Sequence, residues 1–143
     1  MPNHFHLLVY ADERTIMNEM VGSQKRNVLS EGIRNLLHTY TKGINRQNNL
    51  TGSLFQQNTK AKIISNLDYK RVCLHYIHQN PLKARLVHKM EDWQYSSFSD
   101  FIGERKGTLC NINMAIQVLD INFQTFYSDS YQAVNDEAIQ NIL

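Results

Sequence analysis

Two histidines separated by one residue, His4 and His6, stand near the start of the sequence and precede an apolar run at residues 7–9. The apolar run favours a β-strand, in which side chains two residues apart lie on the same face. Two neutral imidazoles on one face can bind a single divalent cation. The spacing therefore predicts a metal site at His4 and His6, and a structural or incidental zinc site is the alternative.

A stripe of basic side chains marks the segment 25–47, which its apolar spacing predicts to be a helix. Arg34, His38, Lys42 and Arg46 recur at every fourth residue and so lie along one face of that helix. Such a stripe is typical either of a solvated face or of contacts with the phosphates of a nucleic acid. Both interpretations stay open at this point.

The histidines and the basic stripe must be positioned by the helices and strands that the rest of the sequence predicts. We expect a short helix over 15–21 and a brief strand over 60–64. A second long helix should begin near Asp68 and end near Asn80, because Pro81 disfavours helical geometry at the residue before it.

The rest of the chain is predicted to be mostly packing and helix. Aromatic residues cluster over 93–101, where core packing is favoured over stacking on single-stranded bases. A helix is expected near 111–120, followed by an apolar run over 121–127 and a final amphipathic stretch that ends at Leu143. We see no chemistry in this tail.

The composition of the chain limits its number of domains and its class of protein. The chain has 143 residues, of which 42% are hydrophobic, so it fits one main domain with an appendage. Fifteen Lys and Arg stand against 13 Asp and Glu, and a net charge of +2 is too small to argue for nucleic acid by itself. Two distant cysteines and the lack of a membrane-length apolar run predict a soluble, reduced, cytoplasmic protein that does not contact membrane.

Four motifs in order resemble the single-tyrosine HUH transposases, and the REP-associated tyrosine transposase-like branch is the closest. The resemblance covers about residues 1–103. The motifs are Met-Pro-Asn-His-Phe-His-Leu-Leu-Val at 1–9, Gly-Ser-Leu-Phe-Gln at 52–56, Tyr-Ile-His-Gln-Asn-Pro-Leu-Lys-Ala at 76–84, and Trp-Gln-Tyr-Ser-Ser-Phe at 93–98.

This resemblance implies an α+β fold, namely a ferredoxin-like α/β sandwich whose central antiparallel sheet carries the histidine strand. It implies a domain over 1–103 with a mostly helical extension over 104–143. It also implies a function: binding hairpin or single-stranded DNA, then cleaving and rejoining one strand through a phosphotyrosine. The divalent cation would be Mg²⁺ or Mn²⁺, held by His4 and His6, where it would neutralise charge on phosphate.

The sequence departs from the family pattern at the nucleophile. Thr59 stands where the resemblance places the tyrosine, and a threonine hydroxyl is a poor substitute because its pKa is much higher than that of phenol. The family's third metal ligand falls near Lys62 or Ile63, which are unsuited to the role. Tyr69 and Tyr40 are the substitute nucleophiles we consider.

Two functions from different classes therefore remain. The first is a metal-dependent endonuclease and strand transferase, and the second is a catalytically silent relative that still binds DNA. The side chains that would contact DNA phosphates in either case are Arg34, Lys42, Arg46, Lys60 and Lys62.

The family's opening strand and helix have no counterpart before Met1. Three interpretations are open: a start codon assigned too late, a truncated gene remnant, or a sheet completed by dimerisation. A lone strand is not stable. We therefore expect a homodimer in which the second copy completes the sheet and covers its exposed edge.

Overall fold

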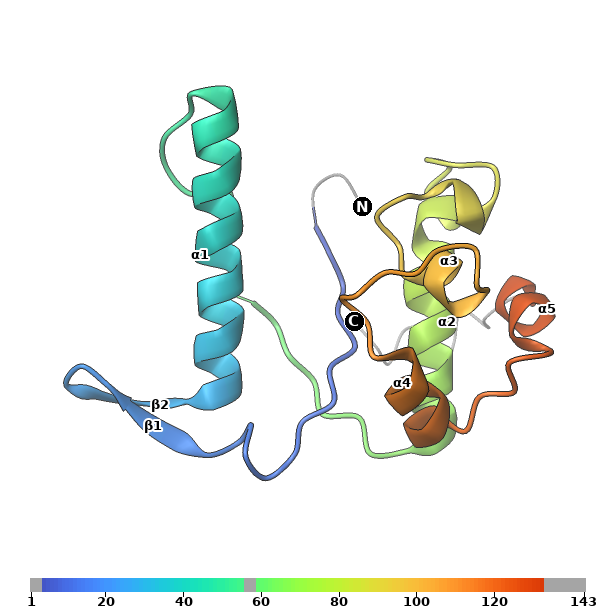
Figure 1. Cartoon of the computed structure of the whole chain (residues 1–143), viewed down its shortest axis with the longest axis horizontal. Coiled ribbons are helices and arrows are strands. Elements are labelled where there is room, and N and C mark those ends of the chain that lie inside the picture. Colours follow the sequence, from blue (N-terminus) through green and yellow to red (C-terminus); the bar gives the residue numbers. More distant parts are fainter. Residues whose placement is uncertain (1–3, 56–58, 133–143) are drawn as a thin grey trace. The chain divides into compact units, whose positions relative to one another are not determined.

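The computed structural model describes residues 4–55 and 59–132 of this chain (Figure 1). The chain forms two compact units. Unit 1 comprises Met1–Leu8 and Lys62–Leu143, and unit 2 comprises Val9–Ala61. The fold is mixed α/β, with several helices and one small antiparallel sheet in the described part of the chain.

Unit 2 begins with a β-hairpin. Strand β1 (Asn18–Val21) pairs with β2 (Gln24–Asn27) in an antiparallel register that sets Asn18 opposite Asn27 and Val21 opposite Gln24. Gly22 turns the chain with φ +62°, a left-handed conformation that the tight two-residue hairpin turn requires. The helix expected over 15–21 was therefore wrong, because hairpin pairing satisfies the backbone of this segment instead.

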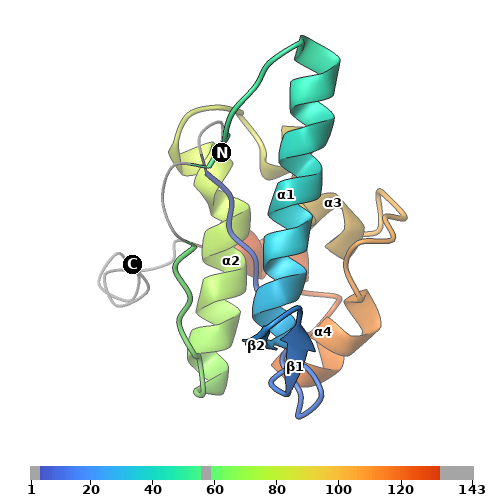
Figure 2. The same cartoon turned by 90° about the vertical axis from the view of Figure 1, so that its left-hand side faces the viewer.

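Helix α1 (Val28–Asn48) follows the hairpin directly, as Figure 2 shows. The Asn27 side chain caps it by accepting a hydrogen bond from the Ser30 amide at 3.2 Å. At the other end Asn49 adopts a left-handed conformation and closes the helix. The predicted helix is confirmed with its start moved to residue 28, although none of its residues, all of which are described, is buried.

Unit 1 is built around helix α2 (Leu67–Lys83). The shorter elements that accompany it are η1 (Met90–Asp92), α3 (Phe98–Phe101), α4 (Ile112–Leu119) and α5 (Phe126–Tyr131). Helix α4 confirms the helix expected near 111–120.

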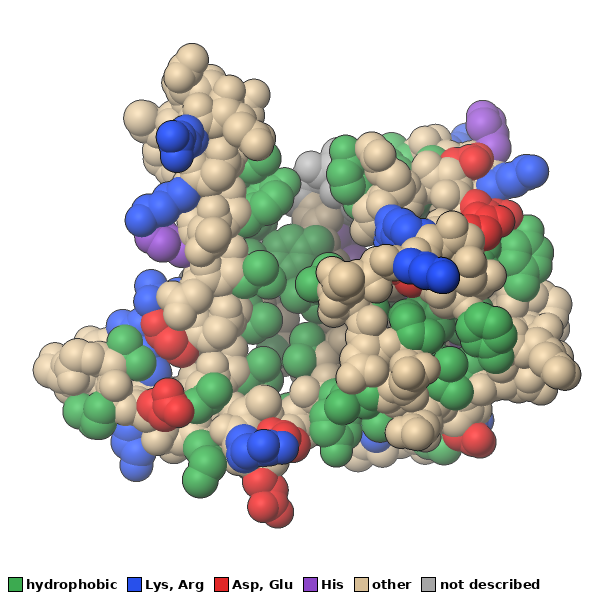
Figure 3. Space-filling model, in the orientation of Figure 1, with side chains coloured by type: hydrophobic (Ala, Val, Ile, Leu, Met, Phe, Trp, Pro, Cys, Tyr) green, Lys and Arg blue, Asp and Glu red, His purple; other side chains and the backbone are tan. Residues whose placement is uncertain are grey.

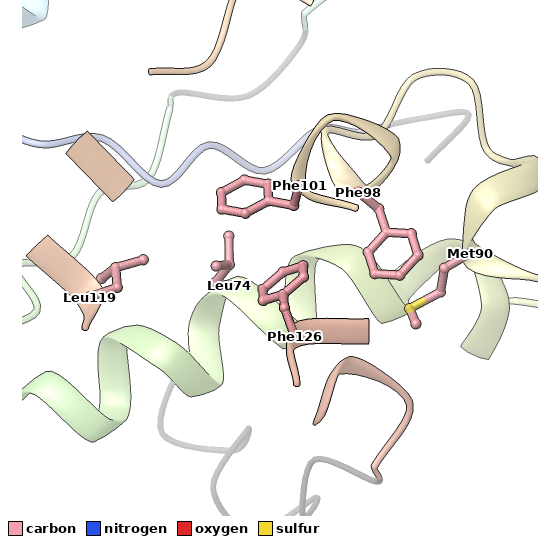
Figure 4. Packing of buried hydrophobic residues seen from close by; sticks show 6 residues of the cluster. All are labelled: Leu74, Met90, Phe98, Phe101, Leu119 and Phe126. Atoms are coloured by element: carbon pink, nitrogen blue, oxygen red, sulfur yellow. The ribbon is translucent and has the colours of Figure 1, made fainter. Parts of the chain in front are cut away.

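The hydrophobic core of unit 1 draws one or two residues from each of these elements. In Figure 4, Phe126 lies among Leu74, Phe98 and Phe101. Phe101 and Phe126 stack with ring centroids 5.0 Å apart, and Leu119 and Met90 lie at the two ends of the cluster (Figure 4). Core packing of the aromatic segment 93–101 is thus confirmed for Phe98 and Phe101 but not for Tyr95, which is 77% exposed. Residues on both sides of position 103 share that core.

Helix α2 does not end before Pro81 as predicted. It continues to Lys83, and the Ala84 amide donates to the Asn80 carbonyl at 2.9 Å. Proline removes one helical hydrogen bond. The buried Pro81 ring packs in unit 1, which offsets that loss.

Residues 4–10 form no strand, and neither do residues 60–64. Both segments lack a paired neighbour within the described residues, and a strand without a partner makes no ladder. The expected strand at His4 and His6 was therefore wrong as secondary structure. The described helices include none that is long and apolar enough to cross a membrane. Parts of two predictions, residues 56–58 and the amphipathic stretch up to Leu143, lie outside the described residues.

Candidate functional site

His4 and His6 lie side by side in unit 1 even without a strand. Their ring centroids are 5.0 Å apart and the rings are nearly perpendicular, at 85°. His6 is half-buried, and its ring meets the edge of the Tyr76 ring on α2, with centroids 5.8 Å apart. The sequence-predicted pair is thus brought together, with His6 held by α2 and His4 more exposed.

The His6 ring carries a buried nitrogen without a partner. Its Nε2 atom makes no hydrogen bond in the described structure. Burial lowers the pKa of His6 below its usual value, and the neighbouring His4 lowers it further. The imidazole is therefore held neutral near pH 7, which leaves a ring nitrogen able to bind a metal ion.

These donors fit a divalent cation of borderline hardness. Imidazole suits zinc better than magnesium or manganese, both of which prefer oxygen ligands and would complete their coordination with oxygen atoms. Among the residues that the structure describes, no group of three or more His, Cys, Asp or Glu side chains gathers around one point. A cation at His4 and His6 would therefore keep open positions for oxygen atoms of a substrate.

Three candidate nucleophiles fall in different units. Thr59 and Tyr40 both belong to unit 2. Thr59 is exposed, and Tyr40 lies on α1 with its ring centroid 6.2 Å from that of Phe55. Tyr69 belongs to unit 1, together with His4 and His6. Of these three candidates, only Tyr69 shares a compact unit with the histidines.

Tyr69 lies in the first turn of α2. Its amide donates to the Asn66 side chain at 2.9 Å, and its half-buried side chain leaves the hydroxyl oxygen buried without a hydrogen bond among the described residues. The Lys62 ammonium lies 5.6 Å from the centre of the Tyr69 ring. Tyr69 and Tyr76 are seven residues apart on one helix face, a rise of about 10 Å. Helix α2 thus carries Tyr69 about two turns from the residue that holds His6.

The predicted DNA-contacting cations differ in how they are paired. Arg34 forms an ion pair with Glu31, which Arg26 also contacts at 3.0 Å. These arginines lower the pKa of Glu31 to about 2, so its carboxylate stays charged near pH 7 and offsets one of the two arginine charges. Lys60 and Lys62 are both exposed. Arg34 is thus already engaged in an ion pair with Glu31 within unit 2.

Lys42 and Arg46 lie in the C-terminal half of α1. Neither makes an ion pair with a carboxylate in residues 4–55 or 59–132. Figure 3 shows Lys, Arg and His side chains following one another along one edge of α1. The basic stripe is therefore exposed, with its uncompensated part toward the end of the helix.

His78 was missed by the sequence reasoning, which placed it at or beyond the margin of the buried face of α2. Its side chain is 1% exposed, and its Nε2 atom lies 2.9 Å from the Ser97 hydroxyl. Desolvation, with a smaller effect of His75, lowers the pKa of His78 to about 3. The only signal in the sequence was that His78 and Ser97 each belong to one of the four motifs.

The motifs at 76–84 and 93–98 thus meet in unit 1, whereas those at 1–9 and 52–56 are described only in part. The transposase resemblance rests on these motifs alone. Comparisons of the chain with protein-family models, with curated proteins and with solved structures found no match.

Proposed function

We propose that this protein is transposase-like, that it binds hairpin or single-stranded DNA, and that it holds a divalent cation at His4 and His6. The observation that carries the proposal is the imidazole pair, with ring centroids 5.0 Å apart and a buried, unpartnered Nε2 on His6. The four motifs support the assignment to DNA chemistry. Mn²⁺ or Mg²⁺ is the ion that the resemblance implies, and zinc, which imidazole ligands suit better, is the competing ion.

His4 and His6 would hold the cation, and Tyr69 would act on the DNA. Because Tyr69 lies about two helical turns from Tyr76, which contacts His6, DNA binding would have to bring the Tyr69 hydroxyl to the phosphate held at the cation. A bound cation supplies positive charge that stabilises the phosphate as negative charge develops on it. The Tyr69 hydroxyl would lose its proton to solvent as its oxygen attacks phosphorus, and the bond from phosphorus to the 3′ oxygen would break. The 3′ oxygen leaves with a proton as a hydroxyl, and the 5′ phosphate stays on Tyr69. The exposed Lys62 ammonium can pair with the phosphate beside this tyrosine.

A silent DNA-binding protein is the second candidate. It is favoured by Thr59, an exposed residue of unit 2 at the position where the resemblance places the tyrosine. It is also favoured by the burial of the Tyr69 hydroxyl, which DNA would have to reach. In this case the cation site and the basic stripe would serve binding alone.

The ferredoxin-like sheet and the homodimer belong to the same proposal. Residues 4–10 have no strand partner within the described residues, so a second copy of the chain can supply one. Light scattering of the full chain at several concentrations tests this directly. A monomer at every concentration would refute the dimer.

A covalent-adduct assay separates the two functions. Hairpin DNA labelled at its 3′ end is incubated with the full chain and Mn²⁺, because the strand that carries the new 5′ phosphate is the one that stays attached. We expect a labelled protein band on a denaturing gel that Tyr69→Phe removes and Tyr95→Phe, at an exposed tyrosine of the same unit, retains. An adduct that survives Tyr69→Phe would exclude this nucleophile, and binding without an adduct would favour the silent protein.

The metal site has its own test. Calorimetric titration of the full chain with Mn²⁺ should show binding that His6→Ala abolishes and that His88→Ala, an exposed histidine elsewhere in unit 1, leaves intact. Equal Mn²⁺ binding by native protein and His6→Ala would overturn the site. Failure of the chain to bind any hairpin DNA at low salt would overturn the proposed function itself.

A further inference from the structure

A shallow surface cavity of about 400 Å³, widely open to solvent, lies in unit 2 between the C-terminal half of α1 and the chain that follows it. This volume is within the range that small organic ligands occupy. None of the described residues that line it is acidic. They are Leu37, His38, Thr41, Lys42, Asn45, Gly52, Ser53 and Phe55.

The outer wall of the cavity is fixed to α1 by hydrogen bonds. The Asn45 side-chain amide donates to the Gly52 carbonyl at 2.9 Å, and the Leu50 amide donates to the Asn45 carbonyl at 2.9 Å. Gly52 has φ +98°, which favours glycine, and the Ser53 hydroxyl donates to the Phe55 carbonyl at 2.7 Å. The wall is therefore shaped by several specific contacts within unit 2.

The residues that line the cavity favour a ligand that carries both an aromatic ring and a negatively charged group. Lys42 provides a positive charge without an ion-pair partner in the described structure, and Thr41 provides a hydroxyl next to it in the chain. Phe55 provides an aromatic face, and its ring lies 6.2 Å from that of Tyr40. Aromatic side chains bind nucleobases by stacking, and lysine binds phosphate as a point charge.

We infer that this cavity binds one nucleoside phosphate, with the base against Phe55 and the phosphate on Lys42. The inference rests on the proposed function and deepens it, because it assigns unit 2 the task of holding an unpaired nucleotide. Arg46 lies one helical turn beyond Lys42 on the same stripe, where it can contact the next phosphate of a strand. Arg34, which Glu31 neutralises, lies at the far end of the stripe and is not needed.

The ligand chemistry has two sources, a nucleotide within a DNA strand or a free mononucleotide. Fluorescence anisotropy of a labelled short oligothymidylate distinguishes them. Competition by an unlabelled strand of equal length, but not by thymidine monophosphate at equal nucleotide concentration, assigns the cavity to strands. Equal competition by thymidine monophosphate assigns it to free nucleotides.

Two variants and their matched controls test the residues. Phe55→Leu should weaken binding of oligothymidylate about 5- to 150-fold, because stacking is worth about 1–3 kcal/mol per base. It should leave the affinity for an abasic strand of equal length unchanged. Tyr10→Leu, at another exposed aromatic residue of unit 2, should bind both strands like the native protein.

Lys42→Gln should lower the dependence of log affinity on log salt by about 0.7, the value for one phosphate on a single strand. Lys25→Gln, at an exposed cation of β2, should leave this slope unchanged. Circular dichroism checks that every variant is folded, which we expect because both cavity side chains lie outside the buried core.

The outcomes separate this inference from the function on which it rests. If Phe55→Leu binds oligothymidylate like the native protein, the cavity is not a base site although DNA binding stands. If Lys42→Gln keeps the native salt slope, the phosphate assignment is wrong. If the native chain binds neither strands nor thymidine monophosphate, the inference and the proposed function both fail.

Discussion

Acidification below about pH 6.5 should destabilise this protein, and the buried His78 should contribute strongly to the loss. The folded state holds the pKa of His78 at about 3, whereas an unfolded histidine has a pKa near 6.5. As the pH falls through 6.5, the His78 imidazole becomes protonated in the unfolded chain but stays neutral in the folded chain. The effect on stability is therefore absent above the unfolded pKa, grows as the pH falls from 6.5 toward 3, and reaches its full destabilising size below that.

The size of the effect follows from the pKa difference. Each pKa unit corresponds to about 1.4 kcal/mol, so the full contribution of His78 is about 5 kcal/mol. Between pH 6 and pH 5 the loss should be about 1.2 kcal/mol, because the unfolded histidine is mostly protonated over that interval. The packing of Phe98, Phe101 and Phe126 against the ring explains why the charged form is excluded.

Urea unfolding at pH 7, 6 and 5, followed by circular dichroism, measures this loss. His78→Gln does not titrate and can still hydrogen-bond to Ser97, so it should be less stable at pH 7 but should lose about 1.2 kcal/mol less than the native protein between pH 6 and pH 5. The pKa values of His6 and His75 are also lowered by burial, but both residues are present in both proteins.

An equal loss in the two proteins would refute the reasoning. If His78→Gln does not fold, an NMR titration of the native protein decides the matter instead. A His78 ring signal that moves with a midpoint near pH 6.5 would mean that the ring is not excluded from protonation.

Three further substitutions test unit 1, each by thermal and urea unfolding. Phe98→Ala should cost about 3–5 kcal/mol, since Phe98 is 0% exposed in the core, and Phe98→Leu should cost less. Asn66→Ala should cost about 1 kcal/mol by removing the cap of α2, and Asn66→Ser should recover most of it; an equal cost for both would argue against capping. Asp100→Asn should cost about 1–3 kcal/mol, because the 7% exposed carboxylate accepts from Arg105 at 2.6 and 2.9 Å. Arg105 lowers the pKa of Asp100, so native stability should also fall as the pH drops below 4, and less so in Asp100→Asn.

Local signals predicted the helices of this chain well. The helix expected to open near Asp68 begins at Leu67, with Asn66 as its cap, and α4 lies within the residues expected for it. Both helices start at an asparagine whose side chain accepts an amide hydrogen bond, a signal that a few neighbouring residues contain. Capping is local, so a single sequence is enough to show it.

Pairing and burial were harder to predict. The apolar residues at 16, 17 and 20 have helical spacing, yet the register of β1 on β2 makes 18–21 a strand. Leu36 and Tyr40 lie at the apolar positions whose spacing predicted α1, yet they are 51% and 56% exposed. Both outcomes depend on what a segment packs against, and that is not a property of the segment itself.

The same distinction applies to the histidines. Alternation along a strand predicted that His4 and His6 would lie on one face, and their rings do meet, although the residues form no strand. A spacing of two residues keeps side chains close in many extended conformations. The proximity of the His4 and His6 rings therefore did not depend on the predicted strand. His78 has no such local signal, because its burial comes from α3 and α5.

The motifs that suggested a transposase therefore differ in what they can support. His78 and Gln79 from one motif and Ser97 and Phe98 from another are buried or half-buried, and they join α2 to the segments that cover it. Residues with these roles are needed by any chain that keeps the core of unit 1, whether or not it cleaves DNA. Activity would depend on other groups, namely the histidine pair and a tyrosine that DNA can reach. A relative that had lost its nucleophile at position 59 would keep both packing motifs, which is why the adduct on Tyr69, and not the resemblance, decides between the two functions.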